Sequence, residues 1–131
     1  MPVSVNADNF EAEVLGADVP VLVDFYSERC APCRLLRPVL EGLAGEYAGR
    51  LKLCLFNIER EPGESDADYE DKFRVLLTCG VMNLPTLLLF AGGAPRRTLV
   101  GLHSREDLLE ILREEGLAPP PGQGAGEAPG E

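Results

Sequence analysis

Residues 19–33 read VPVLVDFYSERCAPC, and this stretch decides the fold. Residues 19–26 form a nearly continuous apolar run, in which Asp24 is the one acid. A run of this kind is typical of a strand that is covered on both faces of a sheet. Cys30 and Cys33 follow it and stand directly before a helical pattern. The stretch therefore predicts a buried strand, a short loop, a Cys-x-x-Cys motif and a helix in immediate succession.

Strands and helices alternate on both sides of this stretch. Strands are expected at 3–5, 51–56, 87–91 and 98–100, and helices at 6–15, from Cys30 to Gly49, at 69–79 and after Ser104. Buried strands that alternate with helices favour a mixed sheet covered on both faces. The glycine pair before the last strand predicts an antiparallel hairpin at the edge. We therefore expect an α/β fold with a central mixed five-stranded sheet and four helices.

The chain is predicted to form one domain and a tail. Its 131 residues are enough to bury a core without disulfides. From Ala118 the composition changes to proline, glycine, alanine and glutamate, which cannot build a core. We expect a domain at residues 1–117 and a disordered tail at 118–131.

Net charge and hydropathy exclude several classes of function. The formal charge is −10, and no cluster of lysine and arginine is present that could neutralise phosphates. We therefore expect no nucleic acid and no membrane as partner. No apolar run approaches the ~20 residues that span a bilayer. Residues 1–10 lack the pattern of a signal peptide, so a cytoplasmic location is predicted.

The spacing of Cys30 and Cys33 indicates redox chemistry. Residues three apart lie on one face of a helix, close enough for a disulfide. At the start of the helix, unpaired amides and the helix dipole favour a thiolate at Cys30, and Pro32 suits the first turn because it lacks an amide hydrogen. Cys30 is thus the expected nucleophile and Cys33 the resolving thiol. A structural zinc site is the alternative, but Cys54 and Cys79 are far apart in the sequence and do not form a second close pair.

Two separate motifs resemble the thioredoxin family. Residues 21–26 followed by CAPCR and Pro38 are similar to the active-site segment of that family, and VMNLPT at 81–86 followed by LLLF is similar to its cis-proline segment. Val100-Gly101 before the last helix also matches. The resemblance covers roughly residues 3–115 and implies the thioredoxin fold.

The resemblance also implies roles for further residues. Pro85 would follow a cis peptide bond beside the cysteines, and the backbone near Leu84 would pair with an extended substrate. Asp24 would be the buried carboxylate that relays a proton to or from Cys33. Gly101 would allow close approach of a backbone near the site. The resemblance implies no bound metal or cofactor beyond the redox-active disulfide, and we expect a monomer.

The sequence departs from the family pattern at three positions. Arg29 replaces the usual tryptophan before the first cysteine, which removes an apolar docking surface and adds a charge. Ala31-Pro32 stands where Gly-Pro is typical, and this pair influences the redox potential. Leu55 stands where a lysine often accompanies the buried aspartate. Asp24 therefore loses a cationic neighbour that the family often has, and we expect its pKa to rise if it is buried as the motif implies. Arg29, Ala31 and Pro32 remain candidates for substrate contact.

The predicted activity is the reduction of protein disulfides through a Cys30/Cys33 dithiol–disulfide cycle. By resemblance, an NADPH-dependent thioredoxin reductase would supply the electrons. Two alternatives stay open at this point. One is a more oxidising disulfide isomerase or oxidase. The other is a redox-regulated binding module that has lost turnover, which fits the missing tryptophan, the acidic segment at residues 59–72 and the tail.

Overall fold

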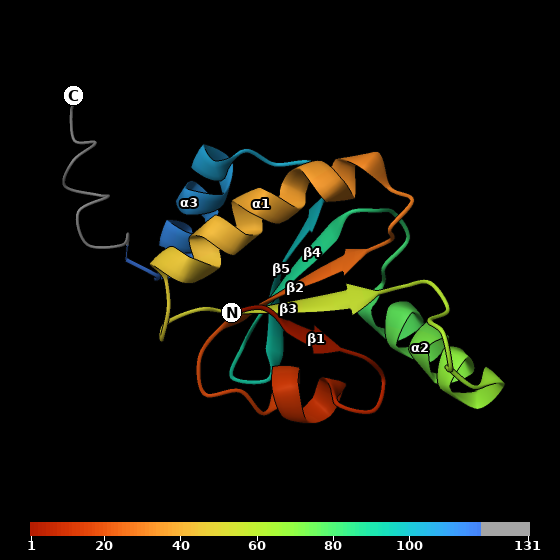
Figure 1. Cartoon of the computed structure of the whole chain (residues 1–131). Helices are drawn as coiled ribbons and strands as arrows, with labels where there is room; N and C mark the ends of the chain where they lie inside the picture. Colours follow the sequence, from red (N-terminus) through yellow and green to blue (C-terminus); the bar gives the residue numbers. More distant parts are fainter. Residues whose placement is uncertain (119–131) are drawn as a thin grey trace.

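The elements of the chain follow the order that the sequence predicts. A computed structural model describes residues 1–118 (Figure 1). The elements are β1 (Val3–Val5), the short π-helix η1 (Glu11–Leu15), β2 (Val21–Tyr26), α1 (Ala31–Glu46), β3 (Lys52–Asn57), α2 (Asp66–Cys79), β4 (Thr86–Ala91), β5 (Ala94–Val100) and α3 (Arg105–Glu114). The expected α/β fold, with a mixed five-stranded sheet and four helices, is confirmed.

The sheet places β2 at its centre. The strand order is β1-β3-β2-β4-β5, with β1, β3 and β2 parallel and β4 and β5 antiparallel to their neighbours. All six residues of β2 pair with β3, and five of them pair with β4. Side chains of β2 enter the apolar clusters on both faces of the sheet, and this explains why its sequence is almost wholly apolar.

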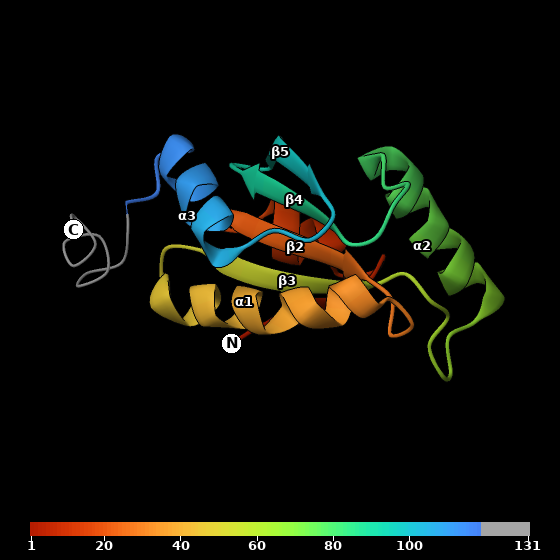
Figure 2. The ribbon, with the colours of Figure 1, turned by 90° about the horizontal axis from the view of Figure 1, so that it is seen from above.

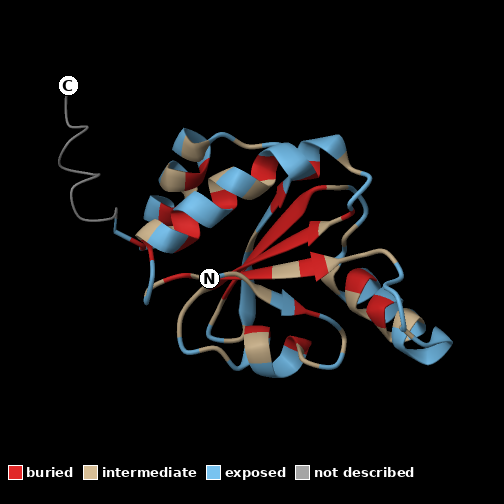
Figure 3. Cartoon of the chain, viewed as in Figure 1, coloured by how far each residue is buried: buried red, intermediate tan, exposed pale blue. Residues whose placement is uncertain are grey.

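Helices cover both faces of the sheet. Figures 1 and 2 show α1 and α3 on one face, while η1 and α2 belong to the other. Two apolar clusters fill the layers. The first contains Leu36, Leu40 and Leu108 against Leu22 and Leu87. The second is aromatic and joins η1 and α2 to the sheet through Phe10, Phe25, Phe56, Leu76 and Phe90. Figure 3 shows that the central strands are largely buried while the helices keep an exposed outer side, and β5 at the edge is mostly exposed.

Two helices begin later or earlier than expected. The side chain of Asn6 accepts the backbone amides of Asp8 and Asn9, which makes a turn there, and η1 starts only at Glu11. Helix α2 begins at Asp66 instead of residue 69, because the hydroxyl of Ser65 accepts the Asp68 amide as an N-cap. The expected stop of α2 at Gly80 is confirmed by its left-handed backbone, with φ of 71°.

The described part of the chain ends just past the last helix. Leu117 belongs to the core cluster under α1 and α3, and the guanidinium of Arg50 donates to the carbonyl of Ala118. The rest of the expected tail, residues 119–131, lies outside the described residues. Within residues 1–118, no helix has the length and apolar character needed to cross a membrane.

Candidate active site

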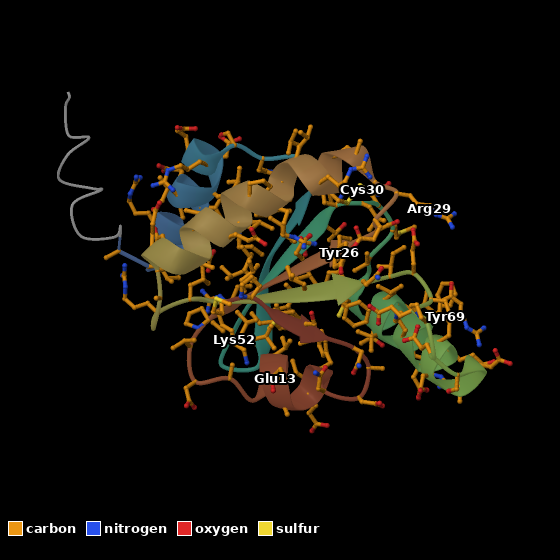
Figure 4. The ribbon with its side chains drawn as sticks, in the orientation of Figure 1. Glu13, Tyr26, Arg29, Cys30, Lys52 and Tyr69 are labelled. Atoms are coloured by element: carbon orange, nitrogen blue, oxygen red, sulfur yellow. A yellow bond between two sulfur atoms is a disulfide. The ribbon has the colours of Figure 1, made fainter. Side chains whose placement is uncertain are left out.

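The two cysteines of the motif lie at the start of α1, after the short loop that follows β2. Cys30 is the N-cap residue of α1, and its sulfur accepts the backbone amide of Cys33 at 3.2 Å. The two residues form a disulfide with a Cα–Cα distance of 5.2 Å. Figure 4 shows Cys30 at the outer end of α1, above the carboxyl end of β2. The structure therefore holds the oxidised state of the pair at a helix N-terminus.

The two sulfur-bearing residues differ in access to solvent. Cys33 is 2% exposed, whereas Cys30 is only partly buried. Ala31 and Pro32, which separate them, are both exposed. An incoming disulfide can therefore reach Cys30 more readily than Cys33, and this difference supports the predicted division into attacking and resolving thiols.

Asp24 is a fully buried carboxylate on the same sheet face as α1. Its exposed fraction is 0%, and its Oδ2 accepts the Nε of Arg37 at 3.4 Å. Its Oδ1 has no hydrogen-bond partner within residues 1–118. Burial raises the pKa of Asp24 from 3.8 to about 6, although the charge and hydrogen bond of Arg37 lower it in part. A carboxyl group with this pKa can exchange a proton near neutral pH.

Asp24 has no lysine beside it on the neighbouring strand, but it does have a cationic neighbour that the sequence did not reveal. Leu55 does pair with Asp24 in the sheet, so the neighbouring strand supplies no charge. The cation comes instead from α1, where Arg37 lies one helical turn beyond Cys33. The spacing of four residues, which puts both on one helix face, was the clue that sequence reasoning missed.

The segment around Pro85 lies at the same end of the sheet. The peptide bond between Leu84 and Pro85 is cis. Thr86 pairs with Phe25 of β2, so Pro85 meets the carboxyl end of the strand that leads to the cysteines. The amide of Gly101 donates to the Pro85 carbonyl at 2.8 Å. Gly101 has φ of 93°, and the space where a Cβ would stand is open.

Arg29 extends away from the cysteines towards α2 (Figure 4). Its side chain is 89% exposed, and its Nε lies 3.8 Å from Glu59. The same carboxylate accepts the hydroxyl of Ser27. Arg29, Glu59 and Tyr69 line a cavity of about 310 Å³ beside the motif. The residue that replaces the family's tryptophan thus faces the acidic segment, an arrangement that the sequence did not reveal.

Lys72 anchors that acidic segment from within. It is 1% exposed, although lysine side chains are almost never fully buried unless they are paired. Its ammonium donates to the Glu59 carbonyl at 2.6 Å and to the Glu64 carboxylate at 3.0 Å, and it lies 3.8 Å from Glu61. These contacts fix the loop that carries Glu59 next to the active site.

The remaining cysteines take no part in the pair. Cys54 is buried in β3, and burial raises the pKa of its thiol to about 11. Cys79, at the end of α2, also has a raised pKa because of burial. Within the part of the chain that the structure describes, no group of three or more histidine, cysteine or acidic residues is placed to hold a metal ion.

Known proteins match the chain over nearly its whole domain. The family model described as Thioredoxin matches residues 1–114. A thioredoxin of Rickettsia bellii is 37% identical over 112 residues, which are 86% of this chain and 96% of the relative. A thioredoxin of Pseudomonas aeruginosa is 40% identical over 110 residues, 84% of this chain and 92% of the relative. A chloroplastic M-type thioredoxin of Chlamydomonas reinhardtii is 32% identical over 85% of this chain and 71% of the relative.

Proposed function

This chain belongs to the thioredoxin family and is a thiol–disulfide oxidoreductase that reduces protein disulfides; we propose that Cys30 attacks, Cys33 resolves and Asp24 relays a proton to or from Cys33. The observation that carries this proposal is the Cys30–Cys33 disulfide at the N-terminus of α1, above a buried carboxylate.

The first step uses the reduced form. The Cys30 thiolate attacks one sulfur of a substrate disulfide. The substrate S–S bond breaks, a bond from Cys30 to that sulfur forms, and the other substrate sulfur leaves as a thiolate that takes a proton from solvent. The amide of Cys33 and the helix dipole support the negative charge on Cys30 before attack.

The second step releases the substrate. The Asp24 carboxylate accepts the thiol proton of Cys33, and the Cys33 thiolate then attacks the Cys30 sulfur. The mixed disulfide breaks, the Cys30–Cys33 bond forms, and the second substrate sulfur leaves as a thiolate. The enzyme has then given two electrons to the substrate. Its redox group is the cysteine pair itself, and the proposal needs no bound cofactor.

We assign substrate contact to the residues that surround the Cys30–Cys33 disulfide. The backbone at Leu84 and Pro85, which lies at the carboxyl end of β2, is the proposed place for an extended substrate segment. The open space over Gly101 leaves room for that segment. Ala31 and Pro32 are exposed between the cysteines, and Arg29 adds a positive charge at the edge of the same surface. That charge favours substrates with an acid near the disulfide.

The native electron donor is proposed from the family. A thioredoxin reductase that draws on NADPH would return the Cys30–Cys33 disulfide to the dithiol. A monomeric protein that maintains the redox state of cytoplasmic proteins and carries electrons between such partners is the role that fits this chemistry.

The activity test is insulin disulfide reduction, followed by turbidity. It is driven separately by dithiothreitol and by NADPH with a thioredoxin reductase. We expect turnover with both donors, loss of turnover in Cys30→Ser, and unchanged turnover in Cys79→Ser as the matched cysteine control. Turnover with dithiothreitol alone would contradict the proposed donor and favour the more oxidising alternative. Absence of turnover with either donor would overturn the reductase proposal in favour of a redox-regulated binding module.

A further inference from the structure

The sheet gives Asp24 no charged neighbour. Its partner on β3 is Leu55 and its partner on β4 is Leu87, both apolar. A carboxylate with 0% exposure in such surroundings needs a compensating charge in order to ionise. That charge must come from the helix layer.

Arg37 reaches Asp24 from α1. Its Nε lies 3.4 Å from Asp24 Oδ2, and its guanidinium carbon lies 4.4 Å from the centre of the Tyr26 ring. Asp24 and Tyr26 are two residues apart on β2 and therefore share one sheet face. The guanidinium is thus held between a carboxylate and an aromatic ring, and its side chain is only 25% exposed.

Arg37 is also close to the resolving cysteine. It follows Cys33 by four residues and lies on the same face of α1. Both residues line a cavity of about 270 Å³, together with Tyr26 and Arg34. One arginine therefore contacts the proposed proton acceptor and borders the space next to the thiol that gives up the proton.

We propose that Arg37 is a positioning residue for the resolving step: held against Tyr26, it stabilises the ionised carboxylate of Asp24. It thereby takes the role of the lysine that the family often has on the neighbouring strand, at the position of Leu55. This inference rests on the proposed role of Asp24 as proton relay. It gives Arg37 no contact with substrate.

The other charged groups near this pair do not substitute for Arg37. On α1, Arg34 donates to the backbone carbonyl of Glu28. Glu28 lies on the loop before Cys30; burial raises the pKa of Tyr26, and Glu28 and Glu61 raise it further, whereas the causes of the shift at Asp24 are burial and Arg37. Burial is the largest influence on the pKa of Asp24, and Arg37 is the residue that lowers it.

The test is the pH profile of kcat/KM for insulin reduction with dithiothreitol. Arg37→Leu keeps apolar bulk over Tyr26 but removes the charge, so the acid limb should move to higher pH by about one unit. At pH 6 the rate should fall about fivefold, and the loss should shrink as the pH rises. Arg37→Lys, the conservative variant, should restore most of the original profile.

Two further variants separate a specific role from a structural one. In an Asp24→Asn background, Arg37→Leu should cause no further shift of the profile. In an Arg37→Leu background, Leu55→Lys should move the limb back, because residue 55 pairs in register with Asp24. An unshifted limb in Arg37→Leu, or an equal shift in the Asp24→Asn background, would overturn the inference. An unchanged profile in Asp24→Asn alone would instead refute the relay role of Asp24.

Discussion

Cys30 is at once the N-cap of α1 and the proposed nucleophile, and its local environment separates it from the other cysteines. The amide of Cys33 points at its sulfur, and the positive end of the helix dipole lies behind that amide. Both interactions favour the thiolate. Burial has the opposite effect on Cys54 and Cys79, whose pKa values are raised. The reactivity of each cysteine is thus determined by its surroundings: a helix N-terminus at Cys30, and burial at Cys54 and Cys79.

Selective alkylation tests this difference. In the fully reduced protein at pH 7, limiting iodoacetamide should modify Cys30 at least about tenfold faster than Cys79, because only the thiolate reacts. Peptide mass spectrometry of the quenched samples identifies the modified residue. Equal labelling of Cys30 and Cys79 would contradict the proposed stabilisation of the Cys30 thiolate.

Asp24 should affect the pH dependence of the free energy of unfolding as well as that of turnover. Its pKa in the folded state, about 6, exceeds its ordinary value of 3.8, so the folded protein binds more protons than the unfolded chain between these values. Its contribution to stability is therefore lost as pH rises through this window. Between pH 4.5 and pH 7.5, the free energy of unfolding should fall by about 2 kcal/mol more in the native sequence than in Asp24→Asn.

Urea unfolding of the oxidised protein at pH 4.5 and pH 7.5 measures this difference. Other groups titrate alike in both proteins, so the comparison isolates Asp24. Parallel pH dependence in the two proteins would show that Asp24 is ionised in the native state at its ordinary pKa.

Among the elements, α2 and the loop before it act as one unit. Ser65 caps the helix, while Lys72 reaches back from its first turns to the loop at Glu59 and Glu64. Glu59 in turn contacts Ser27 and Arg29 next to the cysteines. The acidic segment at residues 59–72 is therefore connected to the active-site loop through one buried lysine.

Removal of Lys72 should be costly. Lys72→Met keeps most of the volume but leaves the Glu64 carboxylate without its buried partner, so the free energy of unfolding should fall by about 3 kcal/mol. Arg74→Ala, which breaks an exposed ion pair with Asp71 on the same helix, should cost less than about 1 kcal/mol. Denaturant titration of the two variants makes the comparison. Equal losses would mean that the Lys72 contacts do not hold the loop.

For the whole molecule, the sequence predicted the order of the elements, the mixed sheet and the cysteine site, but not the long-range charge contacts. The order of elements along the chain follows from apolar runs and from turn residues, whose effects are local, and the family resemblance implied the fold. Arg37 and Lys72 act through long side chains that reach from one element to another. The spacing of apolar residues along the sequence does not indicate such contacts. Arg37 could nevertheless have been identified from the sequence, since its spacing of four residues from Cys33 places it on the same face of α1.

The extent of the folded domain can be tested by truncation. Leu117 is part of the core under α1 and α3, whereas Ala118 is exposed. A chain that ends after Ala118 should keep its melting temperature and its activity. A chain that ends after Gly116 loses Leu117 and should be less stable by about 2 kcal/mol. Thermal unfolding followed by circular dichroism compares the two. A large loss in the longer chain would place part of the fold beyond residue 118.

In the proposed cycle, Cys30 attacks the substrate and Cys33 releases it. The most direct measurement is mass spectrometry of the reduced Cys33→Ser protein after incubation with a disulfide substrate. A covalent mixed disulfide should accumulate on Cys30, because no resolving thiol is left to break it. Rapid release of the substrate, or an adduct on Cys54 or Cys79 in place of Cys30, would contradict the mechanism.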